Sequence, residues 1–167
     1  MTALESLNPA LFSRLVDSLY VDAMVMADEA RSYFDRKAEE DRGGLDMMAR
    51  LTFSCESLKV TTRLMHVIAW LLSQKAWQRG EITAEALSDP KYRLGNASQT
   101  DMSALAVLPP CARDLVTGSQ SLYDRVRRLQ EQMLQINLTP APASDIPNDD
   151  EVPGQARDLL ARLEQAF

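Results

Sequence analysis

The sequence has few of the residues from which catalytic and metal sites are usually built. Its 167 residues include one histidine and two cysteines, too few for a disulfide framework and nearly too few for a zinc site made of protein side chains. Cys55 and His66 are eleven positions apart, or roughly 16 Å along a helix, so they cannot form a nucleophile–base pair within one chain. The composition therefore predicts a protein that is not an enzyme and that has no cofactor or metal.

The motifs of two further kinds of functional site are also missing from the sequence. The neighbouring carboxylates at Asp28-Glu29 and at residues 39–41 are not accompanied by the Glu-x-x-His motifs of a di-iron bundle, so we interpret them as a solvated helix face. The Gly43-Gly44 pair does not follow a strand and has no Lys-Ser/Thr after it, which excludes a phosphate loop of the common type.

Long hydrophobic runs and an excess of positive charge are also absent. The formal charge is −6, which argues against nucleic-acid binding because phosphates need a basic surface. The longest apolar run, residues 67–72, is far short of the roughly 20 residues that span a bilayer. The first nine residues carry Glu5 and no Lys or Arg, unlike a secretory signal. We therefore expect a cytoplasmic protein without membrane insertion, in which Cys55 and Cys111 are reduced.

What the chain does contain is helical periodicity over three long stretches. Apolar residues recur at three- and four-residue steps over about residues 9–37, 46–79 and 110–136. Asn8-Pro9, Gly43-Gly44, Gly80 and Pro109-Pro110 mark their ends. Residues 81–110 are irregular. We predict an all-α fold, an antiparallel three-helix bundle that forms one domain over residues 1–137.

The helix expected at 46–79 has two apolar rows on different faces. The first, which we call the seam, places a large residue every seven positions and a small one four positions after each, a pattern typical of close helix packing. Its members are Leu51, Cys55, Leu58, Thr62, Met65, Ala69, Leu72 and Ala76. The other, which we call the second stripe, consists of Phe53, Val60, Leu64, Val67 and Leu71.

Two apolar rows indicate that this helix is covered from two sides, because a surface helix normally has only one. Either its own chain or a second copy could supply the cover. We hypothesise that the second stripe is the dimer interface. The alternative, that it belongs to the core of a single chain, is equally consistent with the sequence.

Basic residues gather on the second and third helices, and the first helix is acidic. Charge complementarity within the bundle explains this distribution, and a patch that docks a partner is the second explanation. The candidate partner-binding residues are Arg63, His66, Tyr123, Arg125 and Arg127. An ordinary surface role is the alternative for each of them.

The C-terminal part differs in composition. Four of the eight prolines and several acidic residues fall within residues 138–153, which we interpret as a disordered, flexible linker. Residues 154–167 then form a short amphipathic segment, marginal alone and credible when docked. We expect Leu159, Leu163 and Phe167 to dock onto a partner.

Three passages, within residues 51–65, 69–72 and 108–129, resemble the RcdA family, the alphaproteobacterial regulators of CtrA degradation. The more specific blocks are Thr61-Thr62-Arg63-Leu64-Met65 and Leu108-Pro109-Pro110. In order and spacing, the resemblance covers roughly residues 10–137.

The resemblance implies a three-helix bundle that pairs into a homodimer and has a flexible tail. It implies a non-enzymatic adaptor that binds cell-cycle regulators of the CtrA type, acts with other adaptor proteins, and promotes delivery to the ClpXP protease. Recruitment to a cell pole is a further implication. The alternative is a structural homodimeric interaction module without protease cargo.

Overall fold

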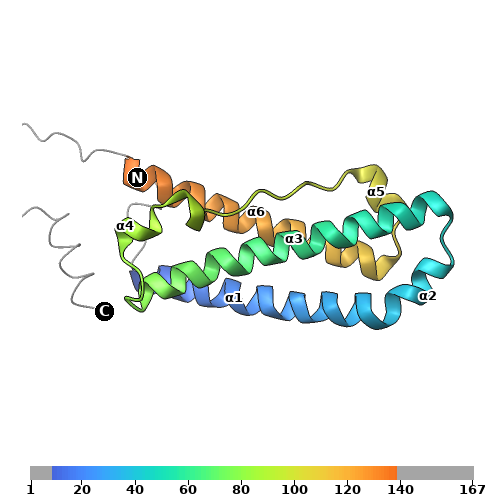
Figure 1. The fold of residues 1–167 in the computed structure, drawn as a ribbon, viewed down its shortest axis with the longest axis horizontal. Helices are drawn as coiled ribbons and strands as arrows, with labels where there is room; N and C mark the ends of the chain where they lie inside the picture. The colour runs from blue at the N-terminus through green and yellow to red at the C-terminus, as the bar shows by residue number, and fades with distance from the viewer. Residues whose placement is uncertain (1–8, 139–167) are drawn as a thin grey trace, which may run out of the picture.

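Three long helices form the body of the molecule. The computed structural model describes residues 9–138, and every regular element in this part of the chain is helical. The long helices are α1 (Pro9–Ser32), α3 (Met47–Gln78) and α6 (Pro110–Leu138) (Figure 1). The shorter elements are a π-helical turn η1 (Tyr33–Lys37), α2 (Ala38–Gly43), α4 (Ala84–Leu87), a 3-10 turn η2 (Pro90–Tyr92) and α5 (Met102–Val107). The predicted all-α fold is confirmed.

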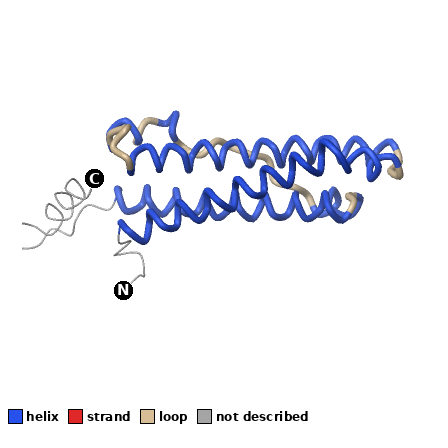
Figure 2. The backbone as a smooth tube through the Cα atoms, turned by 90° about the horizontal axis from the view of Figure 1, so that it is seen from below, coloured by secondary structure: helices blue, strands red, loops and turns tan. Residues whose placement is uncertain are grey.

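The long helices do not alternate in direction as an antiparallel bundle requires. A tight link after α2 reverses the chain, so α1 and α3 are antiparallel. The segment between η2 and α5 then runs back along the length of the bundle (Figures 1 and 2). As a result α6 begins at the same end as α3 and runs parallel to it. The expected arrangement is therefore corrected for this pair, because the irregular connection is long enough to return the chain.

The first helix continues beyond residue 37, where the prediction ended it. It widens through η1 and goes on as α2 until the glycine pair at 43–44. Tyr33 in the π turn is buried, and its hydroxyl donates to Asp41 Oδ2 at 2.6 Å. The Tyr33 ring also lies 6.4 Å, centroid to centroid, from that of Phe53. Burial, with the adjacent Asp41 carboxylate, raises the pKa of Tyr33.

Local signals fix both ends of α3. At its start, Asp46 Oδ1 accepts a hydrogen bond from the Ala49 amide at 2.8 Å, as an N-cap does. At its end, Gly80 has a φ of +72°, and the Glu81 amide donates back to the Ala76 carbonyl at 2.9 Å. The result is one continuous helix of 32 residues, about 48 Å long at 1.5 Å per residue.

The core lies where α1, α3 and α6 meet, and the second stripe of α3 is at its centre. All five side chains of the stripe are buried, with at most 4% of their surface exposed. They belong to one core cluster with side chains such as Val16 and Leu19 of α1 and Val116 and Val126 of α6. The hypothesis that Phe53, Val60, Leu64, Val67 and Leu71 form a dimer interface is therefore wrong, because α1 and α6 of the same chain cover them.

The predictions about the C-terminal part cannot be placed in this fold. Apart from Leu138, which ends α6, the predicted linker lies outside the described residues. Leu159, Leu163 and Phe167 also lie outside them. Among the helices of residues 9–138, none is both long enough and apolar enough to cross a bilayer.

Candidate functional site

The most elaborate polar arrangement surrounds the extended segment at residues 94–101, between η2 and α5. This segment forms no regular secondary structure and lies along α3 and α6 (Figure 1). Its backbone N–H and C=O groups therefore need hydrogen-bond partners outside a helix or a sheet. Several side chains of α3 and α6 supply them.

Arg63 of α3 joins three elements although it is fully buried. Its Nη2 donates to the Ser98 carbonyl and to Thr100 Oγ1, both at 2.7 Å. Its Nη1 donates to Ser119 Oγ of α6 at 3.3 Å. Burial lowers the pKa of the guanidinium, and the nearby negative charge of Glu56 opposes that change. Arg63 thus ties the extended segment to both helices.

Glu56 completes this network about two turns before Arg63 on α3. Its side chain is 3% exposed, and Oε2 accepts a 2.5 Å hydrogen bond from Thr100 Oγ1. Its Oε1 pairs with Lys59 Nζ at 2.8 Å, and Lys59 also donates to the Gln99 carbonyl at 3.1 Å. Because the Thr100 hydroxyl accepts from Arg63 and donates to Glu56, the two buried charges are linked through the segment that they hold.

The other half of the segment is fixed from α6 and α3. The Tyr123 hydroxyl donates to the Gly95 carbonyl at 2.8 Å and accepts from the Ala97 amide at 3.2 Å. The His66 ring lies so close to Gly95 that a Cβ atom there would be 2.2 Å from Nδ1. Only glycine fits at this position without a shift of the ring. The Leu94 amide donates to Gln130 Oε1 at 2.6 Å.

Three of the five predicted partner-binding residues therefore contact the extended segment. Arg63 and Tyr123 are buried, and His66 is half-buried against the segment. The sequence analysis missed Glu56 and Thr100, which complete the network. A signal for Glu56 was present, since it lies four positions from Val60 and so borders the second stripe.

The remaining two predicted partner residues stay on the surface. Arg125 forms a 3.9 Å ion pair with Asp22 of α1, and Arg127 pairs with Glu131 at 3.1 Å within α6. Both side chains are nearly half exposed. Exposed ion pairs of this kind contribute little to stability, so both guanidinium groups remain available to other molecules.

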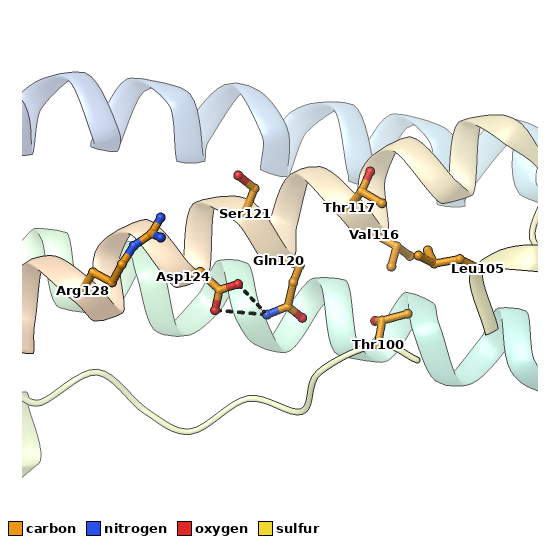
Figure 3. Close-up of a pocket in the computed structure, with 8 residues that line it drawn as sticks. All are labelled: Thr100, Leu105, Val116, Thr117, Gln120, Ser121, Asp124 and Arg128. Carbon is orange, nitrogen blue, oxygen red and sulfur yellow. Dashed lines mark hydrogen bonds between the residues drawn. The ribbon is translucent and has the colours of Figure 1, made fainter. Parts of the chain in front are cut away.

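A shallow groove runs along the outer side of α6, beside the end of the extended segment. Figure 3 shows the Gln120 amide directed at both carboxylate oxygens of Asp124, 3.3 Å away, with Arg128 at one end of the groove. Gln120 Oε1 is buried without a hydrogen-bond partner. The lining residues are Thr100, Leu105, Val116, Thr117, Gln120, Ser121, Asp124 and Arg128. Hydroxyls, one carboxylate and one guanidinium suit polar contacts with a protein chain.

Groups that could hold a metal are absent from residues 9–138, where no three His, Cys, Asp or Glu side chains cluster suitably.

Both cysteines are free thiols on the surface. For Cys55 this differs from the expectation of a small residue packed in a seam, because the seam is not covered in the single chain. Leu51, Leu58, Met65 and Leu72 are 58%, 69%, 65% and 47% exposed.

Comparisons with known proteins identify a matching family and a similar solved structure. The model of a family described as "Protein of unknown function (DUF1465)" matches residues 7–167. The chain is similar to a solved structure, that of RcdA from Caulobacter crescentus CB15, at 33% sequence identity and a TM-score of 0.59. The match covers 71% of this chain and 90% of that one. No curated protein matches the chain.

Proposed function

Because the chain belongs to the DUF1465 family, which is the RcdA family, we propose that it is a non-enzymatic adaptor. In this role it binds cell-cycle regulatory proteins of the CtrA type and promotes their delivery to the ClpXP protease, together with other adaptor proteins. It acts in the cytoplasm and is recruited to a cell pole with the protease.

The observation that carries this proposal is that the chain's buried and half-buried polar side chains contact its own extended segment. The single histidine contacts Gly95, and the buried Arg63 and Glu56 are bonded through Thr100. These groups fix a surface segment in place. A fixed polar surface beside a groove suits the binding of another protein.

Tethering is the proposed mechanism. The folded body holds the cargo while residues 138–167 reach the protease or a second adaptor, with Leu159, Leu163 and Phe167 as the docking residues. Holding the cargo near the protease raises its effective concentration, and short flexible linkers give values in the millimolar range. The adaptor performs no chemistry in this mechanism.

The cargo contacts the groove on α6 and the arginines beside it. Arg125 and Arg127 keep their assignment as partner-binding residues because both are exposed, and Arg128 joins them because it lines the groove. Arg63, His66 and Tyr123 support this surface by holding residues 95–100. They position the binding surface and do not touch the cargo.

A degradation assay tests the proposal. Candidate regulators are incubated with ClpXP and the other adaptors of the family, with and without the purified full-length protein. We expect faster loss of at least one regulator while this protein survives. Unchanged degradation of every candidate would overturn the adaptor proposal.

A pair of charge reversals locates the cargo surface. Arg127→Glu with Arg128→Glu changes the groove and should remove most of the acceleration, because the side chains are exposed and the fold does not depend on them. The matched control is Arg31→Glu with Arg36→Glu, which reverses two exposed charges in and after α1. The control should deliver cargo at the unchanged rate.

The second candidate is a structural homodimeric module without protease cargo. The uncovered seam of α3 favours it as much as it favours a dimeric adaptor, since both need a pairing surface. We include a homodimer in the proposed function for this reason. Faster degradation of a regulator in the assay above separates the two candidates.

A further inference from the structure

A second groove lies at the other end of the extended segment, and the proposed function does not use it. It is formed by α3, η2 and residues 94–96, and its volume is about 380 Å³, within the usual range of binding clefts, about 300–1,000 Å³. We call it the basic groove. The side chains that decide its chemistry are His66, Trp70, Ser73, Lys91, Tyr92 and Arg93.

The basic groove has an excess of positive charge. Lys91 and Arg93 line it, and none of its described lining residues is Asp or Glu. Arg93 is exposed and forms no ion pair with another residue of the described range 9–138. Lys91 lies 3.8 Å from Asp89, and because their side chains are 66% and 47% exposed, this ion pair contributes little. Both cations are therefore available to an acidic occupant.

Aromatic and imidazole rings form part of the same groove. Tyr92 is half-buried, with Lys91 Nζ 5.0 Å from the centroid of its ring. The His66 ring lies close to Gly95, and Trp70 follows about one turn later on α3. Aromatic-lined grooves bind proline-rich segments, which are already extended before binding. The groove thus suits an occupant that is both acidic and rich in proline.

We propose that the occupant is residues 139–153 of this chain, the segment that directly follows α6. The segment contains no basic residue and holds four of the eight prolines. Its carboxylates are those of Asp145, Asp149, Asp150 and Glu151. The acidic residues match Lys91 and Arg93, and the prolines match the rings, so one segment meets both chemical features of the groove.

The end of α6 places this segment within reach of the groove. Helix α6 finishes at Leu138, at the end of the bundle where α4 lies (Figure 1). The Leu94 amide donates to Gln130 Oε1, and Gln130 is about 12 Å along α6 from Leu138. From Leu138 to Asp145 an extended chain spans up to about 25 Å. The carboxylates can therefore meet the groove of their own chain.

Docking of residues 139–153 shortens the tether of the proposed mechanism. An extended chain from residue 139 to residue 167 spans up to about 100 Å, whereas residues 154–167 alone span up to about 50 Å. A tether that cannot span the distance between two sites gives no gain in effective concentration. The contact thus limits delivery until the segment is released. This consequence rests on the proposed function, whereas the contact itself does not.

Paramagnetic broadening in NMR spectra of the full-length protein tests the contact. Cys55→Ser with Cys111→Ser removes the native thiols, which are exposed, and Asn148→Cys then carries a single nitroxide label among the carboxylates. The amide signals of residues 91–96 should lose most of their intensity compared with the same protein after reduction of the label. Unchanged signals at these residues would overturn the proposal and leave the groove to an acidic partner.

Reversing the charges of the groove should remove this broadening. Lys91→Glu with Arg93→Glu makes the groove repel the segment, and both side chains are exposed, so the chain should stay folded. The matched control is Arg31→Glu with Arg36→Glu, which changes the net charge equally at exposed positions in and after α1. Broadening that survives in the groove variant, or that the control loses equally, would show that the groove is not the docking site.

A charge swap tests which carboxylates are bound. Asp149→Lys with Asp150→Lys, added to the groove variant, should restore the broadening, because opposite charges again face each other. Failure to restore it would contradict the pairing of these two residues with the groove.

Mixing two samples distinguishes the chain's own segment from that of another copy. In the mixture, one protein carries the nitroxide and the other carries the NMR isotope. No broadening of residues 91–96 is expected. If these signals broaden, the segment docks onto a second copy and the assignment to its own chain is wrong.

The degradation assay measures the consequence for delivery. The groove variant, Lys91→Glu with Arg93→Glu, should accelerate loss of cargo several-fold over the wild-type protein, because its tether is not shortened. Unchanged delivery by a variant that has lost the broadening would overturn the limit on reach. The NMR measurements use neither cargo nor protease, so failure of the contact and failure of the adaptor role are distinguishable.

Discussion

The helix α3 carries two apolar faces of similar composition, and the bundle buries only one of them. The second stripe is at most 4% exposed, whereas the large residues of the seam are 47–69% exposed. The difference follows from position: α1 and α6 pack against α3 from neighbouring sides, and both contact the second stripe. An apolar row thus shows that a helix face needs cover, but not which chain provides it.

Between the two faces lies a polar edge that holds the extended segment. Glu56, Lys59 and Arg63 lie there, next to the second stripe in the helical repeat. The three faces of one helix therefore have separate tasks. One builds the core, one fixes the segment beside the groove, and the seam stays exposed in the single chain.

Removing Arg63 should have the largest effect on folding. Arg63→Ala leaves the Ser98 carbonyl without its donor and removes a buried positive charge near Glu56, at a cost of about 3–5 kcal/mol in the free energy of unfolding. Urea denaturation measures the loss. Arg31→Ala, at a side chain that is 80% exposed, is the control and should change little. If both substitutions lowered the free energy of unfolding equally, Arg63 would not tie the extended segment to the two helices as we describe.

Truncating one leucine on each face of α3 tests the difference in burial between the two faces. Leu71→Ala in the second stripe should lower the free energy of unfolding by about 2–5 kcal/mol, because it opens a cavity in a packed core. Leu58→Ala on the seam should cost less than about 1 kcal/mol in dilute solution, where copies are apart. Similar losses at both positions would show that the faces do not differ as described.

A smaller effect is expected at the end of the second stripe, where Tyr33 lies near Phe53. Since folding raises the pKa of Tyr33 above its ordinary value of 10.0, the folded state favours the neutral phenol. Its contribution to stability is complete below pH 10 and falls as the pH rises above it, by up to about 1.4 kcal/mol per pH unit.

Tyr33→Phe provides the matched variant for this pH effect. At neutral pH it should lose about 1 kcal/mol with the hydrogen bond to Asp41. Above pH 10 the gap between the two proteins should shrink and then reverse, which urea denaturation at several pH values measures. A constant gap up to pH 11 would contradict the burial of the phenol.

The smallest effect on folding is expected at the surface arginines. Arg127→Ala should change the free energy of unfolding by no more than about 0.5 kcal/mol, because its ion pairs with Asp124 and Glu131 are exposed. In the degradation assay, however, the same change should slow delivery of cargo. If delivery is unchanged, Arg127 does not belong to the cargo surface.

The sequence predicts the long helices well because periodicity and end signals are local. The stop at Gly80 and the start after Pro109 both lie where these residues place them. The direction of α6 was not predictable in this way, because residues 94–101 carry no periodicity and are held by distant side chains such as Tyr123 and Gln130.

The candidate site was predicted only in part, for a related reason. Polar residues on a helix are usually exposed, so Arg63 and Tyr123 were interpreted as partner contacts. Their burial depends on Thr100 and Gly95, far away in the sequence, which meet them only in the folded chain. The sequence could not decide which apolar face of α3 is buried for the same reason. Each face alone would fit the core, and only the folded chain shows which of them is covered.

The most direct test of the account is the concentration dependence of thiol labelling on the two faces of α3. In a background without native cysteines, Val60→Cys and Leu58→Cys place single thiols in the second stripe and in the seam. We predict that Val60→Cys reacts slowly at every protein concentration, whereas Leu58→Cys reacts fast when dilute and becomes protected as copies pair. Labelling of Leu58→Cys that stays fast at all concentrations, or fast labelling of Val60→Cys, would contradict the division of α3 into a core face and a partner face.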